Sequence, residues 1–160
     1  MSDRGQGIML DLLIGAIIFM LVLMSINGFW VGELNSIDDN IESNEMNLIA
    51  FNAIEGLVTG QGSPNGWETL PEASVNEIGL IEGNRVIEEN KLVAFQNMSY
   101  NLAREKLKIR HYDFFFEFEG IDDVNAGLPP MGNADKVVIY RKASYKGVGA
   151  DVKFTLYNLR

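Results

Sequence analysis

The chain of 160 residues contains no cysteine and only one histidine, His111. The lack of cysteine excludes disulfide bonds and thiolate chemistry, and the familiar zinc sites cannot form with a single histidine. A Ser-His-acid mechanism would have to use His111, which we expect to be a surface residue. The sequence also has no nucleophile elbow and no phosphate-binding loop. These absences favour a protein that is not an enzyme, and no catalytic, cofactor-binding or metal-binding residue is assigned.

Acidic residues offer the remaining candidates for chemistry. Asp122, Asp123 and nearby Asp135 carry oxygen atoms suited to calcium, but their spacing lacks the regular pattern of a calcium-binding loop. No spacing singles out a pair of carboxylates for glycoside hydrolysis. We therefore interpret these acids as ordinary loop residues.

Basic residues are nearly absent from residues 33–90, which contain 12 acidic residues and one basic residue, Arg85. Residues 91–160 contain 8 acidic and 11 basic residues, and the whole chain has a net charge of −9. Nucleic acid and anionic lipid head groups should repel the acidic stretch, so we expect no nucleic-acid partner. The interleaved charges of residues 91–160 indicate a solvated surface. The alternative is that opposite charges on the two halves guide contact between subunits.

One long hydrophobic run is present, and it covers the 21 positions from Leu12 to Gly32 without a charged residue. A helix of that length rises about 31 Å, close to the hydrocarbon thickness of a bilayer. Arg4 precedes the run and the next basic residue is Arg85, so the positive-inside rule leaves the N-terminus in the cytoplasm and the rest outside. A secretory signal peptide would have a shorter apolar core and a small-residue cleavage site after it. This run is longer, and Ser25-Ile26-Asn27-Gly28 matches such a site poorly, so we interpret the run as a membrane helix and not as a secretory signal peptide.

The helical pattern continues beyond the hydrophobic run. Apolar residues recur there at spacings of three, four or seven: Leu34, Ile37, Ile41, Leu48 and Phe51. This spacing predicts one helix from about Ile8 to Leu57, apolar all round in its first half and amphipathic in its second. We expect the amphipathic half to pack on its own domain.

The residues before the apolar run carry a resemblance to a known family. Arg4-Gly5-Gln6-Gly7 precedes Asp11, and RGQGIMLD followed by a long apolar helix resembles the class III signal peptide of archaeal type IV pilins. In that family a prepilin peptidase removes a short basic leader, and the apolar helix then forms the filament core. The resemblance implies a cut between Gly5 and Gln6. A cut between Gln6 and Gly7 is the alternative, because it makes Asp11 the fifth residue of the mature chain, the usual place of the family's acid.

The resemblance also gives Asp11 a role in assembly. Cleavage creates a free amine inside an apolar bundle, and the Asp11 carboxylate of a neighbouring subunit can neutralise it. The alternative is an acid at the membrane boundary that reaches water. A second stretch, Gly60 to Glu68 (GQGSPNGWE), resembles the glycine–proline–tryptophan loop of many archaeal pilin-like proteins. We expect its glycines to end the long helix and Trp67 to cap the domain core.

The rest of the chain predicts a small α+β domain. Asn90 is the expected N-cap of a helix over 91–109, and strands are expected at 113–119, 136–142 and 151–159, joined as an antiparallel meander. In the first strand, Phe114, Phe116 and Phe118 alternate onto one face. Asn97-Met-Ser is a candidate glycosylation triplet, placed inside the expected helix.

The predicted fold class is α+β, with a long hydrophobic N-terminal helix as a type IV pilin-like stem, followed by a helix packed on a three- to four-stranded antiparallel sheet. The predicted organisation is a leader at 1–6, a hydrophobic transmembrane or filament-core helix at 7–32, and an extracytoplasmic domain at 33–160. The resemblance implies a subunit of a type IV pilus-like filament at the cell surface, held in the cell membrane before assembly. Its expected partners are copies of itself or related pilins, prepilin peptidase and membrane lipid. The alternative is a membrane-anchored binding or sensor domain that never polymerises.

Overall fold

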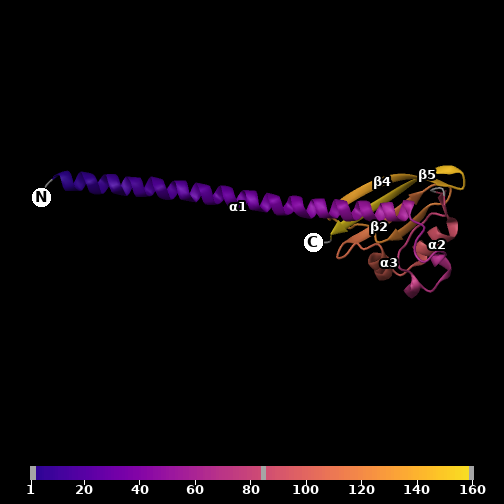
Figure 1. The fold of residues 1–160 in the computed structure, drawn as a ribbon. Helices are drawn as coiled ribbons and strands as arrows, with labels where there is room; N and C mark the ends of the chain where they lie inside the picture. The colour runs from indigo at the N-terminus through magenta and orange to yellow at the C-terminus, as the bar shows by residue number, and fades with distance from the viewer. Residues whose placement is uncertain (1–2, 84–85, 159–160) are drawn as a thin grey trace. The chain divides into compact units, whose positions relative to one another are not determined.

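The computed structural model describes residues 3–83 and 86–158, and within its first helix it describes the side chains of residues 12–26 and 42–59. The chain divides into two compact units, Met1–Ser43 and Asn44–Arg160, called here the N-terminal and C-terminal units. Helix α1 (Asp3–Thr59) contributes residues to both (Figure 1). Each unit is described by itself.

Residues 3–43 of the N-terminal unit are helical; the side chains of residues 12–26 are all exposed, and Glu42 is half-buried. Among the described residues, no helix is both long enough and apolar enough to cross a membrane. The long hydrophobic stem in the predicted fold class is therefore wrong. The predicted boundaries of the leader and of the helix at 7–32 stay predictions.

The C-terminal unit places a mixed sheet against helices. After α1 its elements are the 3₁₀ turns η1 (Trp67–Thr69) and η2 (Glu72–Ser74), β1 (Val86–Ile87), α2 (Glu89–Asn97), α3 (Tyr100–Lys106), β2 (Asp113–Glu119), β3 (Val124–Gly127), β4 (Asp135–Tyr145) and β5 (Val148–Asn158). The sheet order is β1-β4-β5-β2-β3, with β1 parallel to β4 and every other pair antiparallel. The predicted three- to four-stranded antiparallel sheet is therefore also wrong. The two unpredicted strands, β1 and β3, have two and four residues, too few for a periodic pattern.

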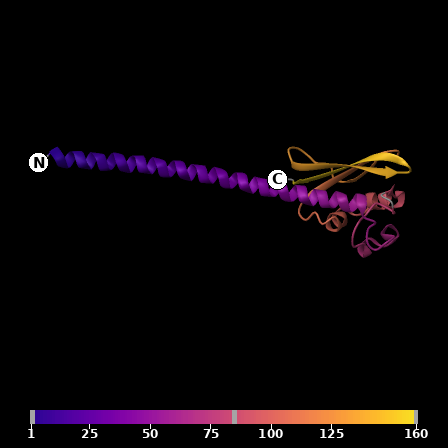
Figure 2. The same ribbon diagram turned by 45° about the horizontal axis from the view of Figure 1, so that its top comes forward.

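The alternation in β2 builds the centre of the core, as the sequence predicts. Phe114, Phe116 and Phe118 are buried, and they lie opposite Leu156, Phe154 and Val152 of β5. All three helices cover this one face of the sheet, which is seen edge-on in Figure 2. From α1 the core takes one helix face, made by Met46, Ala50, Ala53, Ile54, Leu57 and Val58.

The single helix predicted over 91–109 is two helices. Between α2 and α3, Met98 (φ −64°, ψ 143°) and Ser99 (φ −59°, ψ 134°) adopt extended backbone. The break directs Met98 into the core and lets the Tyr100 hydroxyl donate to Asp113 Oδ1 at 2.6 Å, at the start of β2. The N-cap of α2 is Glu88, so the prediction of Asn90 is wrong.

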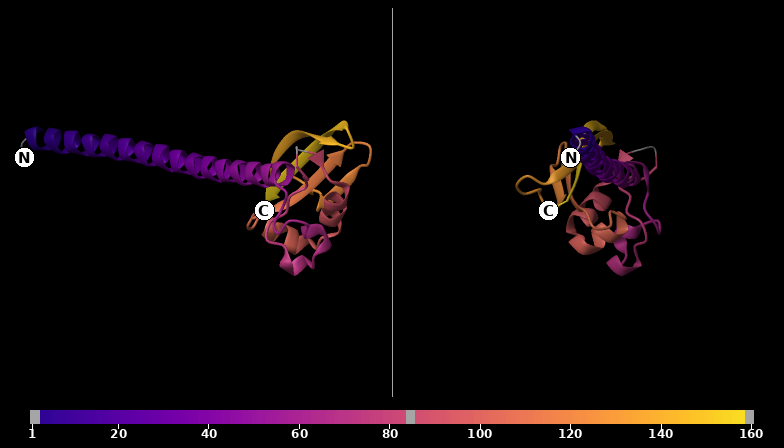
Figure 3. Two further views of the ribbon diagram at one scale, coloured as in Figure 1. Left: turned by 45° about the vertical axis from the view of Figure 1, so that its right-hand side comes forward. Right: turned by 90° about the vertical axis from the view of Figure 1, so that its left-hand side faces the viewer.

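The loop after α1 is tied to the core by two buried side chains, and Figure 3 shows this loop alongside α2 and α3. Trp67 is 1% exposed and its Nε1 donates to the carbonyl oxygen of Gly79 at 2.9 Å, which confirms the predicted core-capping role. Lys91 on α2 is 2% exposed, and its Nζ donates to the carbonyl oxygens of Gln61 at 3.0 Å and Ile81 at 2.9 Å.

Gly62 lies where this loop passes Trp67, and its φ of +80° is a left-handed conformation. An added Cβ would overlap the Trp67 ring, so Gly62→Ala combines backbone strain with a steric clash. We expect the free energy of unfolding to fall by about 2–4 kcal/mol in chemical denaturation. Gly149→Ala is the matched control, because nothing lies within 4 Å of its Cβ position, and equal losses in the two variants would contradict the argument.

Candidate interaction surface

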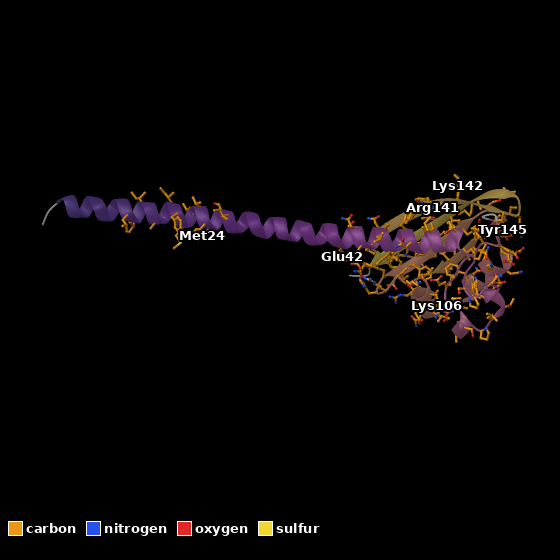
Figure 4. The ribbon with its side chains drawn as sticks, viewed as in Figure 1. Met24, Glu42, Lys106, Arg141, Lys142 and Tyr145 are labelled. Atoms are coloured by element: carbon orange, nitrogen blue, oxygen red, sulfur yellow. The ribbon has the colours of Figure 1, made fainter. Side chains whose placement is uncertain are left out.

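Exposed hydrophobic side chains gather on one stretch of α1, called here the apolar segment and defined as residues 12–26. Twelve of its side chains are large, apolar and 40–74% exposed: Leu12, Leu13, Ile14, Ile17, Ile18, Phe19, Met20, Leu21, Val22, Leu23, Met24 and Ile26. Figure 4 shows these side chains projecting from the helix, with Met24 labelled. Because a helix that is apolar all round is normally buried in protein or lipid, this segment requires a partner.

The small residues of the apolar segment lie at three positions, Gly15, Ala16 and Ser25. An added Cβ at Gly15 would meet nothing within 4 Å, so this position leaves space at the helix surface. The Ser25 hydroxyl donates to the Leu21 carbonyl at 2.9 Å and so presents no unpaired donor to an apolar neighbour. Small residues of this kind let helix backbones approach closely.

In the C-terminal unit, α1 buries one face and leaves apolar side chains on another. Leu48 is 62% exposed and lies roughly opposite the buried face, at about 100° of rotation per residue. Phe51, nearer the edge of that face, is 46% exposed. We expected the amphipathic half of this helix to pack on its own domain, and residues 46–58 do so, but through a face that leaves Leu48 and Phe51 exposed. Leu34, Ile37 and Ile41, the other members of that stripe, lie outside the described side chains.

Arg141 of β4 fixes α1 against the sheet beside Phe51. Its Nε donates to Glu55 Oε1 at 2.6 Å, and its guanidinium carbon lies 5.0 Å from the centre of the Phe51 ring. Alternation along β4 places Arg141 on the same face as Val137 and Ile139, toward the helices. This contact was not predicted from the sequence, although the alternation of residues along β4 was a usable signal for it.

A groove of about 700 Å³ runs along the other side of α1 in this unit. Its walls include Leu48 and Gly56 of α1 and residues 60–62 of the following loop. The end of α3 and the chain after it add Lys106, Leu107, Lys108 and Arg110. Two ion pairs lie on it, Arg110 to Glu45 and Lys108 to Glu77, each at 2.6 Å.

The basic cluster near this groove is neutralised within the domain. Besides those two pairs, Arg104 lies 3.5 Å from Asp113 and Lys106 lies 3.1 Å from Glu105. Each cation therefore has a carboxylate neighbour, as expected for a solvated surface with interleaved charges. The basic residues thus form no strongly positive patch.

The acids considered for calcium take part in other contacts. Lys146 Nζ at the β4–β5 turn lies 2.9 Å from Asp122 Oδ2 and 2.9 Å from Glu89 Oε2, and the Tyr145 hydroxyl donates to Asp122 at 3.0 Å. Asp123 accepts a hydrogen bond from the Gly120 amide at 3.3 Å. Within residues 3–83 and 86–158, no three or more His, Cys, Asp or Glu side chains form a metal-binding group.

Hydrogen bonds from Lys146 and Tyr145 lower the pKa of Asp122 below its ordinary value of 3.8. A lowered folded-state pKa means that this stabilisation is present above pH 3.8 and is lost as pH falls through the folded value. We expect Asp122→Asn to reduce stability at pH 7 and to weaken the further loss below about pH 4. Denaturation curves from pH 7 to pH 2.5 measure this, and Lys146→Met should reproduce it. A pH slope identical to that of the unchanged chain would contradict the assignment.

The remaining residues singled out from the sequence are placed as follows. His111 is exposed, beside Tyr112, and Asn97 is exposed at the end of α2. The expected processing site, Arg4, Gly5, Gln6 and Gly7, and the expected assembly residue Asp11 lie on the backbone of α1 but outside the described side chains. Their roles stay predictions.

The chain is an α+β protein with an exposed apolar helix segment. No known protein family, characterised protein or solved structure matches the chain.

Proposed function

We propose that this protein is a structural subunit of an archaeal type IV pilus-like surface filament, assembled by packing of the apolar segment against copies of itself or related pilins. The observation that carries the proposal is the exposure of twelve large apolar side chains within residues 12–26. Removing one such side chain from water is worth about 1.5–3 kcal/mol, so the segment stays either in lipid or packed against other helices. The step from lipid to filament then depends on close packing between helices, which the small residues Gly15, Ala16 and Ser25 permit.

The processing, location and partners belong to the same proposal. Prepilin peptidase removes the leader near Gly5, membrane lipid surrounds the apolar segment before assembly, and residues 33–160 lie outside the cytoplasm. Asp11 pairs with the new amine of a neighbouring subunit. The exposed Leu48 adds apolar surface on α1 in the C-terminal unit. The proposed role is structural and includes no enzymatic activity.

The groove in the C-terminal unit favours a second candidate. A hollow of about 700 Å³ is within the size range of small-molecule sites, so a membrane-anchored binding or sensor domain that does not polymerise is the alternative. In that case the leader stays attached.

Native cells distinguish the two functions. We expect electron microscopy of shed surface material to show filaments that contain this chain, and N-terminal sequencing to begin at Gln6 or Gly7. A chain that keeps Met1 and is found only as single molecules in the membrane fraction would support the alternative and overturn the filament proposal.

A further inference from the structure

The triplet Asn97-Met98-Ser99 is the single Asn-X-Ser/Thr sequence in the chain, and the structure places it at a break between helices. Asn97 is the last residue of α2, and Met98 and Ser99 are extended before α3 begins at Tyr100. Side chains two positions apart do not face the same side of a helix, whereas in extended backbone they do. The break therefore brings Asn97 and Ser99 to one side of the chain.

The exposure of the three residues follows this alternation. Asn97 and Ser99 are exposed, while Met98 between them is 9% exposed and belongs to the core. The Ser99 hydroxyl makes no capping hydrogen bond to α3, and among the described residues no hydrogen bond engages the Asn97 amide group. Both polar groups of the triplet are therefore available at the surface.

The backbone under the triplet is held in place. The Met98 amide donates to the Phe95 carbonyl at 3.3 Å, and the Ser99 amide donates to Glu72 Oε1 at 3.3 Å. With Met98 anchored in the core, the extended backbone of Met98 and Ser99 that places Asn97 and Ser99 on one side is built into the folded domain.

We propose that Asn97 is an N-glycosylation site of this protein, a modification that depends on the proposed location of residues 33–160 outside the cytoplasm. The donor is an oligosaccharide joined through phosphate or diphosphate to a membrane lipid, and a membrane oligosaccharyltransferase carries out the transfer. The Asn97 amide nitrogen forms a bond to the anomeric carbon, and the bond from that carbon to the phosphate oxygen breaks. The lipid phosphate leaves with the electron pair, and a transferase base takes the amide proton. The Ser99 hydroxyl is the recognition group two residues on.

Mass spectrometry of the full chain from native cells tests the site. Trypsin releases residues 92–104, because Lys91 and Arg104 flank the triplet. We expect this peptide to carry a glycan mass that is absent from Asn97→Gln and Ser99→Ala. Ser99→Thr should keep the modification, and so should the nearby control Asn101→Gln. Since both changed side chains are exposed, loss of the glycan without loss of expression separates modification from misfolding.

The results separate this inference from the filament proposal. Filaments whose 92–104 peptide is unmodified would overturn the glycosylation site and leave the filament function standing. A glycosylated chain that never forms filaments would support the site and overturn the function. If the chain is recovered only from the cytoplasm, the site is tested in vitro. Purified folded chain is incubated with native membranes, which carry lipid-linked sugars. Failure to transfer a glycan to Asn97 in this assay would overturn the site.

Discussion

Replacing Ile17 and Leu21 together with aspartate should abolish filaments while leaving the thermal unfolding of the C-terminal unit unchanged. The two residues are four positions apart, so they lie on one side of the helix, and both are exposed in the single chain. Each aspartate costs about 3 kcal/mol in hydrocarbon, so the pair opposes burial by about 6 kcal/mol. The measurements are electron microscopy of surface material and circular dichroism of the full chain in detergent.

Ser25→Ala is the control for this variant, because its hydroxyl bonds only within the same helix, to the Leu21 carbonyl. It should form filaments normally. Filaments of normal number and length from the double aspartate variant would show that the apolar segment is not the assembly surface. The core residues all lie at Met46 or beyond, which is why the expected unfolding temperature does not move.

Replacing Lys91 with methionine should lower the melting temperature by about 10 °C, the second large effect. Lys91 is buried, its ammonium donates to the Gln61 and Ile81 carbonyls, and it lies 3.7 Å from Glu88. Methionine has a similar length but no donor, so two carbonyl oxygens lose their partner. An unsatisfied buried acceptor costs about 1–3 kcal/mol, and a loss of about 3 kcal/mol in a domain of this size corresponds to that shift.

The matched control is Lys142→Met, since the Lys142 side chain is 87% exposed and its ion pair with Asp151 lies in solvent. Exposed pairs contribute about 0–1 kcal/mol, so the control should melt within a few degrees of the unchanged chain. Both are measured by thermal denaturation of the full chain at neutral pH. Equal shifts in the two variants would contradict the clamping role of Lys91.

Strong local periodicity predicted the central part of the fold. The alternating phenylalanines gave β2 its observed bounds of 113–119, and the glycines after residue 59 gave the end of α1 to within a few residues. Trp67 was placed correctly because a large aromatic residue in a glycine-rich loop has to bury its ring. In each case the signal lies within about ten neighbouring residues.

Features set by tertiary contact were not predicted. The stretch from Glu89 to Lys106 has helical periodicity throughout, and the break at Met98 and Ser99 depends on burial of Met98 and on the bond from Tyr100 to Asp113. Strand β1 exists through its pairing with Ser144 and Tyr145, almost sixty residues later in the chain. Local patterns carry no information about such partners.

The candidate surface was predicted in composition but not in detail. Its apolar character is plain from the residue types at 12–26, whereas the exposure of Leu48 and Phe51 depends on which face of α1 meets the sheet. The pair of Arg141 and Glu55 contributes to that choice, and these residues lie far apart in the sequence. The apolar spacing alone favoured the wrong face.

The division of α1 between the two units has a practical consequence. All the buried residues that form the core, from Met46 to Leu156, lie in the unit that begins at Asn44. A shortened chain starting near Asn44 would keep all of these core residues and lose the exposed apolar segment. Such a fragment is the natural starting material for crystallisation or for raising antibodies against the native surface of the protein.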